Sequence, residues 1–329
     1  MIAAMNTSES RPVPKASTIE VDEDRAGQRV DNFLLNHLKG VPKSRIYRML
    51  RKGEVRVNKG RIKASYRLEA GDEVRIPPVR QGEPAKTREP GAKVLSLIEN
   101  SILAEEKGFL VLNKPSGIAV HGGSGLNYGV IEALRKLRPD APYLELVHRL
   151  DRETSGILVI AKKRSVLREL HSLLRGEGGG MEKRYLALVR GCWQDGERRV
   201  DAPLLKNTLR SGERVVKVSP EGKAALSLFR PVAIYEQIGD RGASLVEIDL
   251  KTGRTHQIRV HAAYIDFPIA GDEKYGDAEF NRLLKEKGLQ RLFLHAKSIE
   301  FSLSGGDQKY QFTAPMGDEL KNILEQLEV

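Results

Sequence analysis

Leu144-Glu-Leu-Val-His-Arg-Leu-Asp-Arg-Glu-Thr-Ser-Gly-Ile-Leu-Val-Ile-Ala161 is the most informative segment of this chain. Its two ends, Leu144–Val147 and Ile157–Ala161, are short apolar runs that predict two strands. A charged loop lies between them, and catalytic groups often lie on loops held by rigid strands. Asp151, flanked by two arginines, is therefore the first candidate for chemistry. A turn-forming Asp with surface ion pairs is the alternative, and the spacing alone leaves both open.

Outward from this loop, predicted strands outnumber predicted helices. Short apolar or alternating segments predict strands at Phe109–Leu112, Tyr185–Val189, Leu245–Leu250 and Leu292–Phe301. A helix is predicted by the spacing of Val166, Leu167, Leu170, Leu173 and Leu174. Because strands follow one another along the chain, the pattern favours an α+β domain with a mixed, mostly antiparallel sheet over a doubly wound parallel one.

The positive charge of the chain is concentrated near its beginning. The 329 residues carry a net charge of +11, and residues 26–90 hold 16 Lys and Arg against 7 Asp and Glu, a net of +9. The same segment has a foldable α/β pattern, with helical spacing from Val30 to Leu38, a second helix between Pro42 and Gly53, and strands at Glu54–Val57 and Asp72–Ile76. An edge of this kind neutralises phosphates and predicts binding to folded RNA. Its cations are Lys43, Arg45, Arg48, Arg51, Lys52 and Lys59.

Composition shifts divide the chain into four parts. Residues 1–20 lack periodicity and are expected to be a flexible tail, residues 21–85 form the basic module, and residues 86–100 form a linker that continues a Pro-rich polar stretch. Residues 101–329 form the main domain. No apolar run exceeds five residues, which predicts no membrane partner and a cytoplasmic location. The single cysteine, Cys192, excludes a disulfide framework.

A second polar cluster, Lys251–His261, follows a predicted strand. Thr255 is expected to cap a helix that carries His256 and Arg259. His256 and His261 are five residues apart, so they do not share a helix face as metal ligands at i and i+4 do, and no metal site is predicted. A basic role toward RNA, or pairing with a carboxylate, is favoured.

Other motif-like segments point to no further chemistry. Residues 122–125 (GGSG) match neither the P-loop nor the dinucleotide-binding spacing, so no nucleotide cofactor is predicted. Residues 176–180 (GEGGG) are interpreted as a mobile linker, and Ser155 lacks the GxSxG context of an acyl-transfer nucleophile.

Two resemblances to known families account for most of the chain. Residues 27–85, with VPKSRIYRMLRKGEVRVN and YRLEAGDEVRIP, resemble the S4 RNA-binding domain. HRLDRETSG, KRYLALVRG and KTGRTHQIRVHAAYIDFPIAGDEKYGD resemble the three main motifs of the RluA-type pseudouridine synthases, and LVLNKPSGIAVHGG resembles the segment before them. Glu153 stands where Asp is commoner, and the glycine stretch at 176–180 is longer than usual.

The resemblance implies the pseudouridine synthase fold and isomerisation of uridine in large-subunit (23S) ribosomal RNA, by a monomer with no cofactor. It implies Asp151 beside C1′ of the ribose, either adding to C1′ or taking a 2′ proton, and Arg259 as its ion-pair partner, with Arg254 as second choice. Tyr185 would stack on the uracil and assist proton loss from C5, with a merely structural buried aromatic as the alternative. Arg149 would fill the gap left by the flipped base. The implied RNA contacts of the main domain are Arg149, His148 and Arg254.

Two other functions stay open from the sequence. A non-catalytic RNA-binding factor for ribosome assembly would use the basic module alone. A nucleoside hydrolase would use the same carboxylate but release free uracil.

Overall fold

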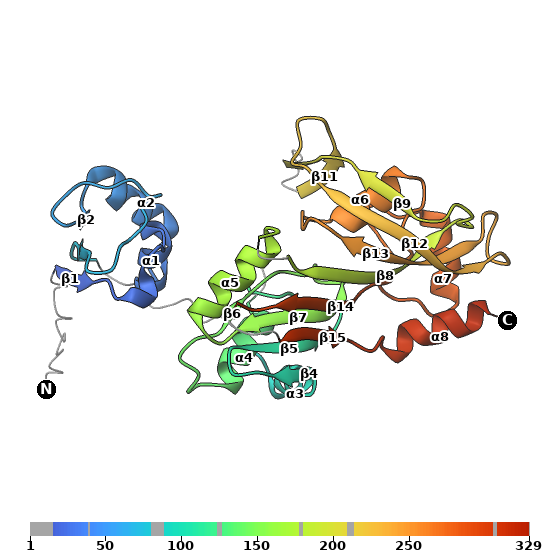
Figure 1. The fold of residues 1–329 in the computed structure, drawn as a ribbon, viewed down its shortest axis with the longest axis horizontal. Helices are drawn as coiled ribbons and strands as arrows, with labels where there is room; N and C mark the ends of the chain where they lie inside the picture. Colours follow the sequence, from blue (N-terminus) through green and yellow to red (C-terminus); the bar gives the residue numbers. More distant parts are fainter. Residues whose placement is uncertain are drawn as a thin grey trace, which may run out of the picture. The chain divides into compact units, whose positions relative to one another are not determined.

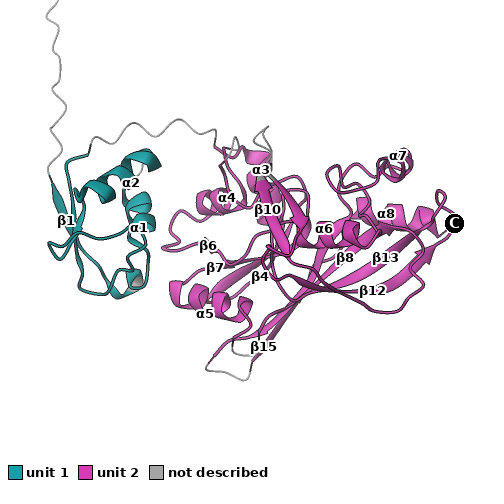
Figure 2. Ribbon diagram, turned by 90° about the horizontal axis from the view of Figure 1, so that it is seen from above, with its two compact units in different colours: residues 1–87 teal, residues 88–329 magenta. Residues whose placement is uncertain are grey.

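The computed structural model describes residues 16–38, 40–79, 89–123, 127–177, 180–208, 214–304 and 308–328. The chain divides into two compact units, residues 1–87 and residues 88–329 (Figure 2). Each unit has its own buried apolar cluster. The division falls within the predicted linker of residues 86–100.

The first unit contains the two helices α1 and α2 (Figure 1) and a small antiparallel sheet in the strand order β1-β3-β2. Val30, Phe33 and Leu34 point inward from the first helix, and Ile46, Met49 and Leu50 from the second. The helix spacing predicted here is confirmed, although β2 is shorter than the predicted strand. The elements are β1 (Ser17–Glu20), a 3-10 helix (Glu23–Arg25), α1 (Val30–His37), α2 (Lys43–Lys52), β2 (Arg56–Val57) and β3 (Glu73–Ile76).

Helix α2 ends where the sequence predicts. Gly53 adopts a left-handed backbone with φ 68°, and its N–H returns to the carbonyls of Leu50 and Met49. Glycine takes this conformation without the steric cost that a Cβ would add. The helix therefore buries its apolar side, while Arg48, Arg51 and Lys52 stay exposed.

The predicted tail and the predicted linker both extend too far toward the C-terminus. Residues 17–20, assigned to the tail, form β1 because they pair antiparallel with β3. Residues 92–100, assigned to the linker, form α3 (Ala92–Asn100), whose Ile98 is fully buried in the core of the second unit. Residues 1–15 and 80–88 lie outside the described residues.

The second unit is built on a ten-stranded sheet in the order β4-β5-β7-β14-β8-β13-β12-β9, with β15 beside β14 and β6 beside β7. Among the described strands, β7 and β14 run parallel and every other neighbouring pair is antiparallel, so the predicted fold class is confirmed. Strands β10 and β11 form a separate hairpin. The elements are α3, β4 (Ile102–Glu105), β5 (Phe109–Lys114), α4 (Val130–Leu137), β6 (Glu145–Leu146), β7 (Ser155–Ala161), α5 (Arg164–Leu174), β8 (Glu182–Arg190), β9 (Arg198–Asp201), β10 (Leu204–Thr208), β11 (Arg214–Val218), β12 (Leu226–Tyr235), β13 (Ala243–Leu250), α6 (Gln257–Tyr264), α7 (Ala278–Glu286), β14 (Leu294–Ser302), β15 (Lys309–Thr313) and α8 (Asp318–Leu327).

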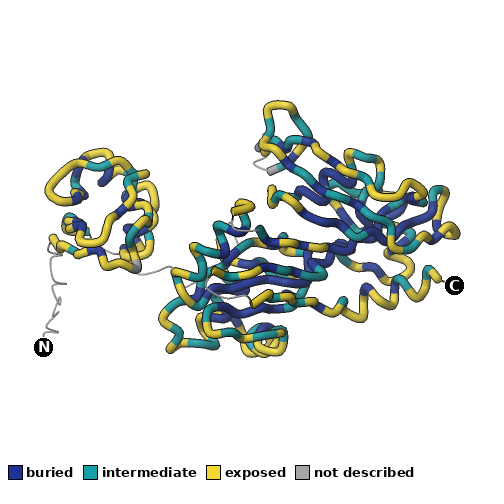
Figure 3. Tube along the Cα trace, in the orientation of Figure 1, coloured by how far each residue is buried: buried dark blue, intermediate teal, exposed yellow. Residues whose placement is uncertain are grey.

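The central strands of this sheet are buried (Figure 3), whereas β12 also has exposed positions. Side chains alternate along β8: Tyr185, Ala187 and Val189 join the larger apolar cluster, whereas Leu186 and Leu188 join the cluster with α7 and α8. Strand β7 is buried at all seven positions. This explains why the centre of the sheet reads as continuous apolar runs rather than as alternating ones.

The strand register places the loop before β7 beside β8. Ser155 and Gly156 at the start of β7 lie opposite His295 and Ala296 of β14, and Ala296 in turn lies opposite Tyr185 of β8. The predicted strand at Leu144–Val147 is reduced to two residues, whereas the predicted strand at Tyr185–Val189 is confirmed within β8. Among the described residues, no helix is long and apolar enough to span a membrane.

Candidate active site

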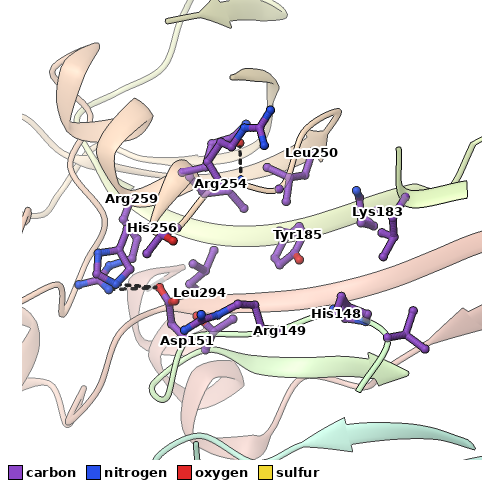
Figure 4. Close-up of a pocket in the computed structure, with 17 residues that line it drawn as sticks. His148, Arg149, Asp151, Lys183, Tyr185, Leu250, Arg254, His256, Arg259 and Leu294 are labelled. Carbon is purple, nitrogen blue, oxygen red and sulfur yellow. Dashed lines mark hydrogen bonds and ion pairs between the residues drawn. The ribbon is translucent and has the colours of Figure 1, made fainter. Parts of the chain in front are cut away.

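A cavity of about 340 Å³ opens where the loop before β7, the strand β8 and the start of α6 meet (Figure 4). This volume lies within the usual range of small-molecule pockets. The first and last of these segments lie more than 100 residues apart in sequence, as Asp151 and Arg259 do, and the strand order brings all three together. Six of the predicted site residues line the cavity: His148, Arg149, Asp151, Tyr185, Arg254 and Arg259.

Arg259 lies between two carboxylates. Its Nη1 donates to Asp151 Oδ2 at 3.3 Å, while Nε and Nη2 donate to the two oxygens of Asp272 at 2.7 Å each. The bidentate pair fixes the plane of the guanidinium, as expected for an arginine fork. Arg259 is thus aimed at Asp151 by Asp272.

Asp272 is part of the site although the sequence did not single it out. Its side chain is fully buried, and Oδ1 also accepts the N–H groups of Lys274 and Tyr275. Burial acts to raise the pKa of Asp272, but the hydrogen bonds and charge of Arg259 outweigh it, and the pKa is lowered. The available signal was an Asp two residues after the apolar run Pro268–Ala270, where a buried carboxylate needs a partner.

The two carboxylates, Asp272 and Asp151, keep Arg259 positively charged. Burial acts to lower its pKa, but the hydrogen bonds and charges of Asp272 and Asp151 raise it overall. Asp151 Oδ1 has no protein partner among the described residues. One oxygen of Asp151 is therefore held and the other is available.

Tyr185 lines the cavity on the side of β8. The residue is 6% exposed, and no described residue forms a hydrogen bond with its hydroxyl. Burial, with a contribution from the negative charge of Asp151, raises the pKa of Tyr185 above its usual value. Its phenol is therefore protonated at neutral pH.

The start of α6 corrects one prediction. The helix begins at Gln257, and its N-cap is His256 rather than Thr255; His256 has a left-handed backbone with φ 52°. The ring of His256 faces Asp151, with Nε2 3.8 Å from Oδ2. His261 instead hydrogen-bonds Ser227 and the carbonyl of Ala202 in the core, so the two histidines share no site.

A fully buried lysine clamps the loop that carries Asp151. Lys114 Nζ donates to the carbonyls of Pro115, Ile118 and Arg152 at 2.7, 2.8 and 3.0 Å. Gly117 N donates to the same Arg152 carbonyl. The sequence signal for this clamp was a lysine two residues after the apolar strand Phe109–Leu112.

A second network holds the other end of the loop. Arg291 donates to the carbonyl of Glu153 and to Ser155 Oγ at 3.3 and 3.1 Å. The Ser155 hydroxyl lies 2.9 Å from Nδ1 of buried His295, whose Nε2 lies 3.1 Å from the Ala314 carbonyl. Ser155 is therefore structural, as the absence of a nucleophile motif predicted.

The predicted RNA contacts of the main domain differ in whether their side chains already have partners within the protein. His148 Nε2 accepts the Val159 N–H at 3.2 Å, and burial lowers the pKa of His148 to about 4, so it is neutral. Arg254 Nε donates to the Ala224 carbonyl at 3.1 Å, so Arg259 rather than Arg254 pairs with Asp151. Arg149 is exposed at the edge of the cavity.

The predicted cations of the first unit fall into two groups. Arg45 pairs with Glu54 at 2.9 Å, and Lys43 lies over the ring of Tyr47. In contrast, no carboxylate of the described residues pairs with the remaining four, which are Arg48, Arg51, Lys52 and Lys59. The predicted glycine segments at 122–125 and 176–180 lie partly outside the described residues.

Comparison with known proteins defines the class. Residues 108–264 match the family of RNA pseudouridylate synthases, and residues 28–74 match the S4 domain. The chain belongs to the RNA pseudouridine synthase family and is an RNA pseudouridine synthase with an S4 domain.

Among its relatives, the chain is 56% identical to the ribosomal large subunit pseudouridine synthase C of Escherichia coli O157:H7, over 95% of this chain and 97% of the relative. It is 57% identical to the protein of the same name from Pasteurella multocida (strain Pm70), over 93% and 92% of the two chains. Among solved structures, human RNA pseudouridylate synthase domain containing 4 is similar with a TM-score of 0.56 and 27% identity, over 72% of this chain and 96% of that one.

Proposed function

We propose that this chain isomerises specific uridines of large-subunit (23S) ribosomal RNA to pseudouridine, with Asp151 as the carboxylate that acts on the ribose. The observation that carries the assignment is the Asp151–Arg259–Asp272 array, which holds Oδ2 of Asp151 and leaves Oδ1 without a protein partner among the described residues. The substrate class follows from the names of the relatives and from the S4 domain.

The reaction breaks the bond between uracil N1 and ribose C1′, turns the base, and joins C5 to C1′. C5 loses a proton and N1 gains one, so nothing is oxidised or reduced. The reaction therefore needs no cofactor, and we propose that a monomer carries it out in the cytoplasm. Positive charge develops at C1′ as the bond breaks, as in glycoside hydrolysis.

Asp151 stabilises this charge or bonds to C1′ through Oδ1. Arg259 orients the Asp151 carboxylate. Because Arg259 also pairs with Asp272, its positive charge is divided between two carboxylates and balances only part of the negative charge of Asp151. In a second route, Asp151 removes a 2′ proton to give a glycal. Both routes need the same held carboxylate.

Tyr185 and Arg149 are proposed to stabilise the flipped-out state of the uracil base. The buried, protonated ring of Tyr185 offers a face for the flipped uracil, and its raised pKa disfavours a phenolate base. Arg149, exposed at the cavity edge, takes the place of the flipped base in the RNA stack. Arg254, His148 and the cations of the first unit are proposed to position the RNA.

Asp151→Asn tests the proposal. The substitution keeps the size of the side chain but removes its charge, so tritium release from 23S RNA labelled at uridine C5 should fall by at least about 10³-fold, because no nucleophile or base remains. RNA binding, measured by filter retention, should change less than about threefold.

The alternatives give different results. Tight RNA binding without tritium release by the wild-type chain would indicate a non-catalytic assembly factor. Free uracil among the products would indicate a nucleoside hydrolase, because pseudouridine formation returns the base to the same ribose.

A further inference from the structure

His256 takes a backbone conformation that its residue type seldom adopts. Its φ of 52° and ψ of 22° lie in the left-handed region, where a side chain other than glycine is strained. Such strain persists where the surroundings hold the residue, and it is frequent at active sites. Here the strain turns the ring into the cavity, next to Asp151 (Figure 4).

Tyr275 is placed to select which nitrogen of this ring carries the hydrogen. The Tyr275 hydroxyl accepts the Val216 N–H at 3.0 Å and lies 2.9 Å from His256 Nδ1. A hydroxyl has one hydrogen to donate, and the tautomer relevant here is the one in which Tyr275 donates it to Nδ1. The neutral imidazole then carries its hydrogen on Nε2, the nitrogen nearest Asp151 Oδ2.

Burial, aided by two neighbouring cations, favours the neutral form of His256. Burial lowers its pKa from the usual value, and the positive charges of Arg259 and Lys274 act in the same direction, while Asp151 and Asp272 act against them. The Tyr275 ring packs edge-on against the imidazole. A second full cation at Oδ2 would therefore be unfavourable beside Arg259.

We propose that His256 is a positioning residue for Asp151, in which the neutral imidazole donates from Nε2 to Oδ2 and Tyr275 holds the tautomer that can donate. This inference rests on the proposed role of Asp151. The 3.8 Å separation is longer than a hydrogen bond and closes when the bound nucleotide excludes water from the cavity. Arg259 and His256 then hold the same oxygen, and Oδ1 alone meets the ribose.

Two substitutions separate this role from a structural one. His256→Gln keeps an N–H donor at the position of Nε2, whereas His256→Asn is shorter and loses it. Asparagine, however, tolerates the left-handed backbone better than glutamine does. A donor role therefore predicts that the Gln variant is the more active, and a backbone role predicts the reverse.

Single-turnover tritium release at saturating enzyme is the readout, with RNA affinity and thermal unfolding measured alongside. We expect the Asn variant to be slowed about 10- to 100-fold with unchanged RNA affinity, the range for one hydrogen bond to a charged group. The Gln variant should retain at least about a third of the wild-type rate. Tyr264→Phe, on the exposed side of α6, is the matched control and should behave as wild type.

The pH profile gives a second readout. Below the pKa of His256 the wild-type ring becomes a cation beside Arg259, and its rate should fall; the Gln variant does not titrate there and should lose less. If the wild-type chain is active, the inference would be overturned by a Gln variant no faster than the Asn variant. It would also be overturned if the wild type and the Gln variant lost rate equally at acidic pH. Absence of wild-type activity would instead overturn the proposed function.

Discussion

At the scale of single residues, the active site shows how a carboxylate is held without being neutralised. Arg259 places two donors on Asp272 and one on Asp151, and Asp272 is the more deeply buried of the two acids. Most of the arginine's charge is therefore balanced before Asp151 is counted. In the proposed reaction, Asp151 therefore offers Oδ1 to the ribose while Oδ2 is held by Arg259.

Lys114 predicts an unusual dependence of stability on pH. Burial lowers its pKa to about 7, whereas the unfolded chain has the ordinary value of 10.5. Between these values the unfolded state binds more protons, so the contribution of Lys114 to the free energy of unfolding should rise with pH, by up to about 1.4 kcal/mol per pH unit.

Lys114→Met removes this contribution and leaves three carbonyls without their donor, which should destabilise the fold by about 2 kcal/mol or more. Urea unfolding of both proteins at pH 7, 8 and 9 measures the difference. The difference in the free energy of unfolding between wild type and Lys114→Met should increase with pH. A constant difference would show that Lys114 stays charged in the folded protein throughout this range.

At the scale of elements, the catalytic loop is fixed from both sides by its neighbours. The turn Pro115–Ile118 binds its middle through Lys114, and β14 binds its end through His295. The parallel pairing of β7 with β14 brings their backbones close at Gly156, whose φ is 104°. An added Cβ at Gly156 would overlap the carbonyl oxygen of Ala296.

Gly156→Ala should therefore destabilise the second unit by about 3 kcal/mol or more, since both backbone strain and a backbone clash are introduced. Gly288→Ala is the matched control, because Gly288 has φ 99° but no atom within 4 Å of an added Cβ. It should cost only about 1 kcal/mol. Equal shifts in the thermal midpoints of the two variants would show that strain alone, not strand packing, requires Gly156.

At the scale of the whole molecule, the two units divide the positive charge and the chemistry. Each unit has its own apolar core, and the proposed catalytic residues all lie in the second. The first unit presents Arg48, Arg51, Lys52 and Lys59 without carboxylate partners among the described residues. These four are the cations that can exchange counter-ions for RNA phosphates.

Deletion of residues 1–88 should leave the second unit folded and should weaken RNA binding. If the four cations contact phosphates, the slope of log affinity against log salt should become less steep by about 3. Replacing Arg48, Arg51 and Lys52 by Gln in the full chain should reproduce most of this change. Unaltered salt dependence in both proteins would remove the first unit as the RNA anchor.

The α+β class, the central strands and the basic module could be predicted from the sequence, because they depend on local periodicity and composition. It also indicated Asp151, Tyr185 and Arg259, through the resemblance of their motifs. Residues 17–20 and 92–100 were misassigned because their structure depends on partners distant in sequence, β3 and the core around Ile98.

Only the tertiary structure decided how the candidate residues act on one another. That Arg259 and not Arg254 pairs with Asp151, that Asp272 aims Arg259, and that Tyr275 binds His256 are matters of distance. These distances follow from the order β7-β14-β8 and from the position of α6. A one-dimensional pattern contains the residues of this site but not the strand register that brings them within hydrogen-bonding reach.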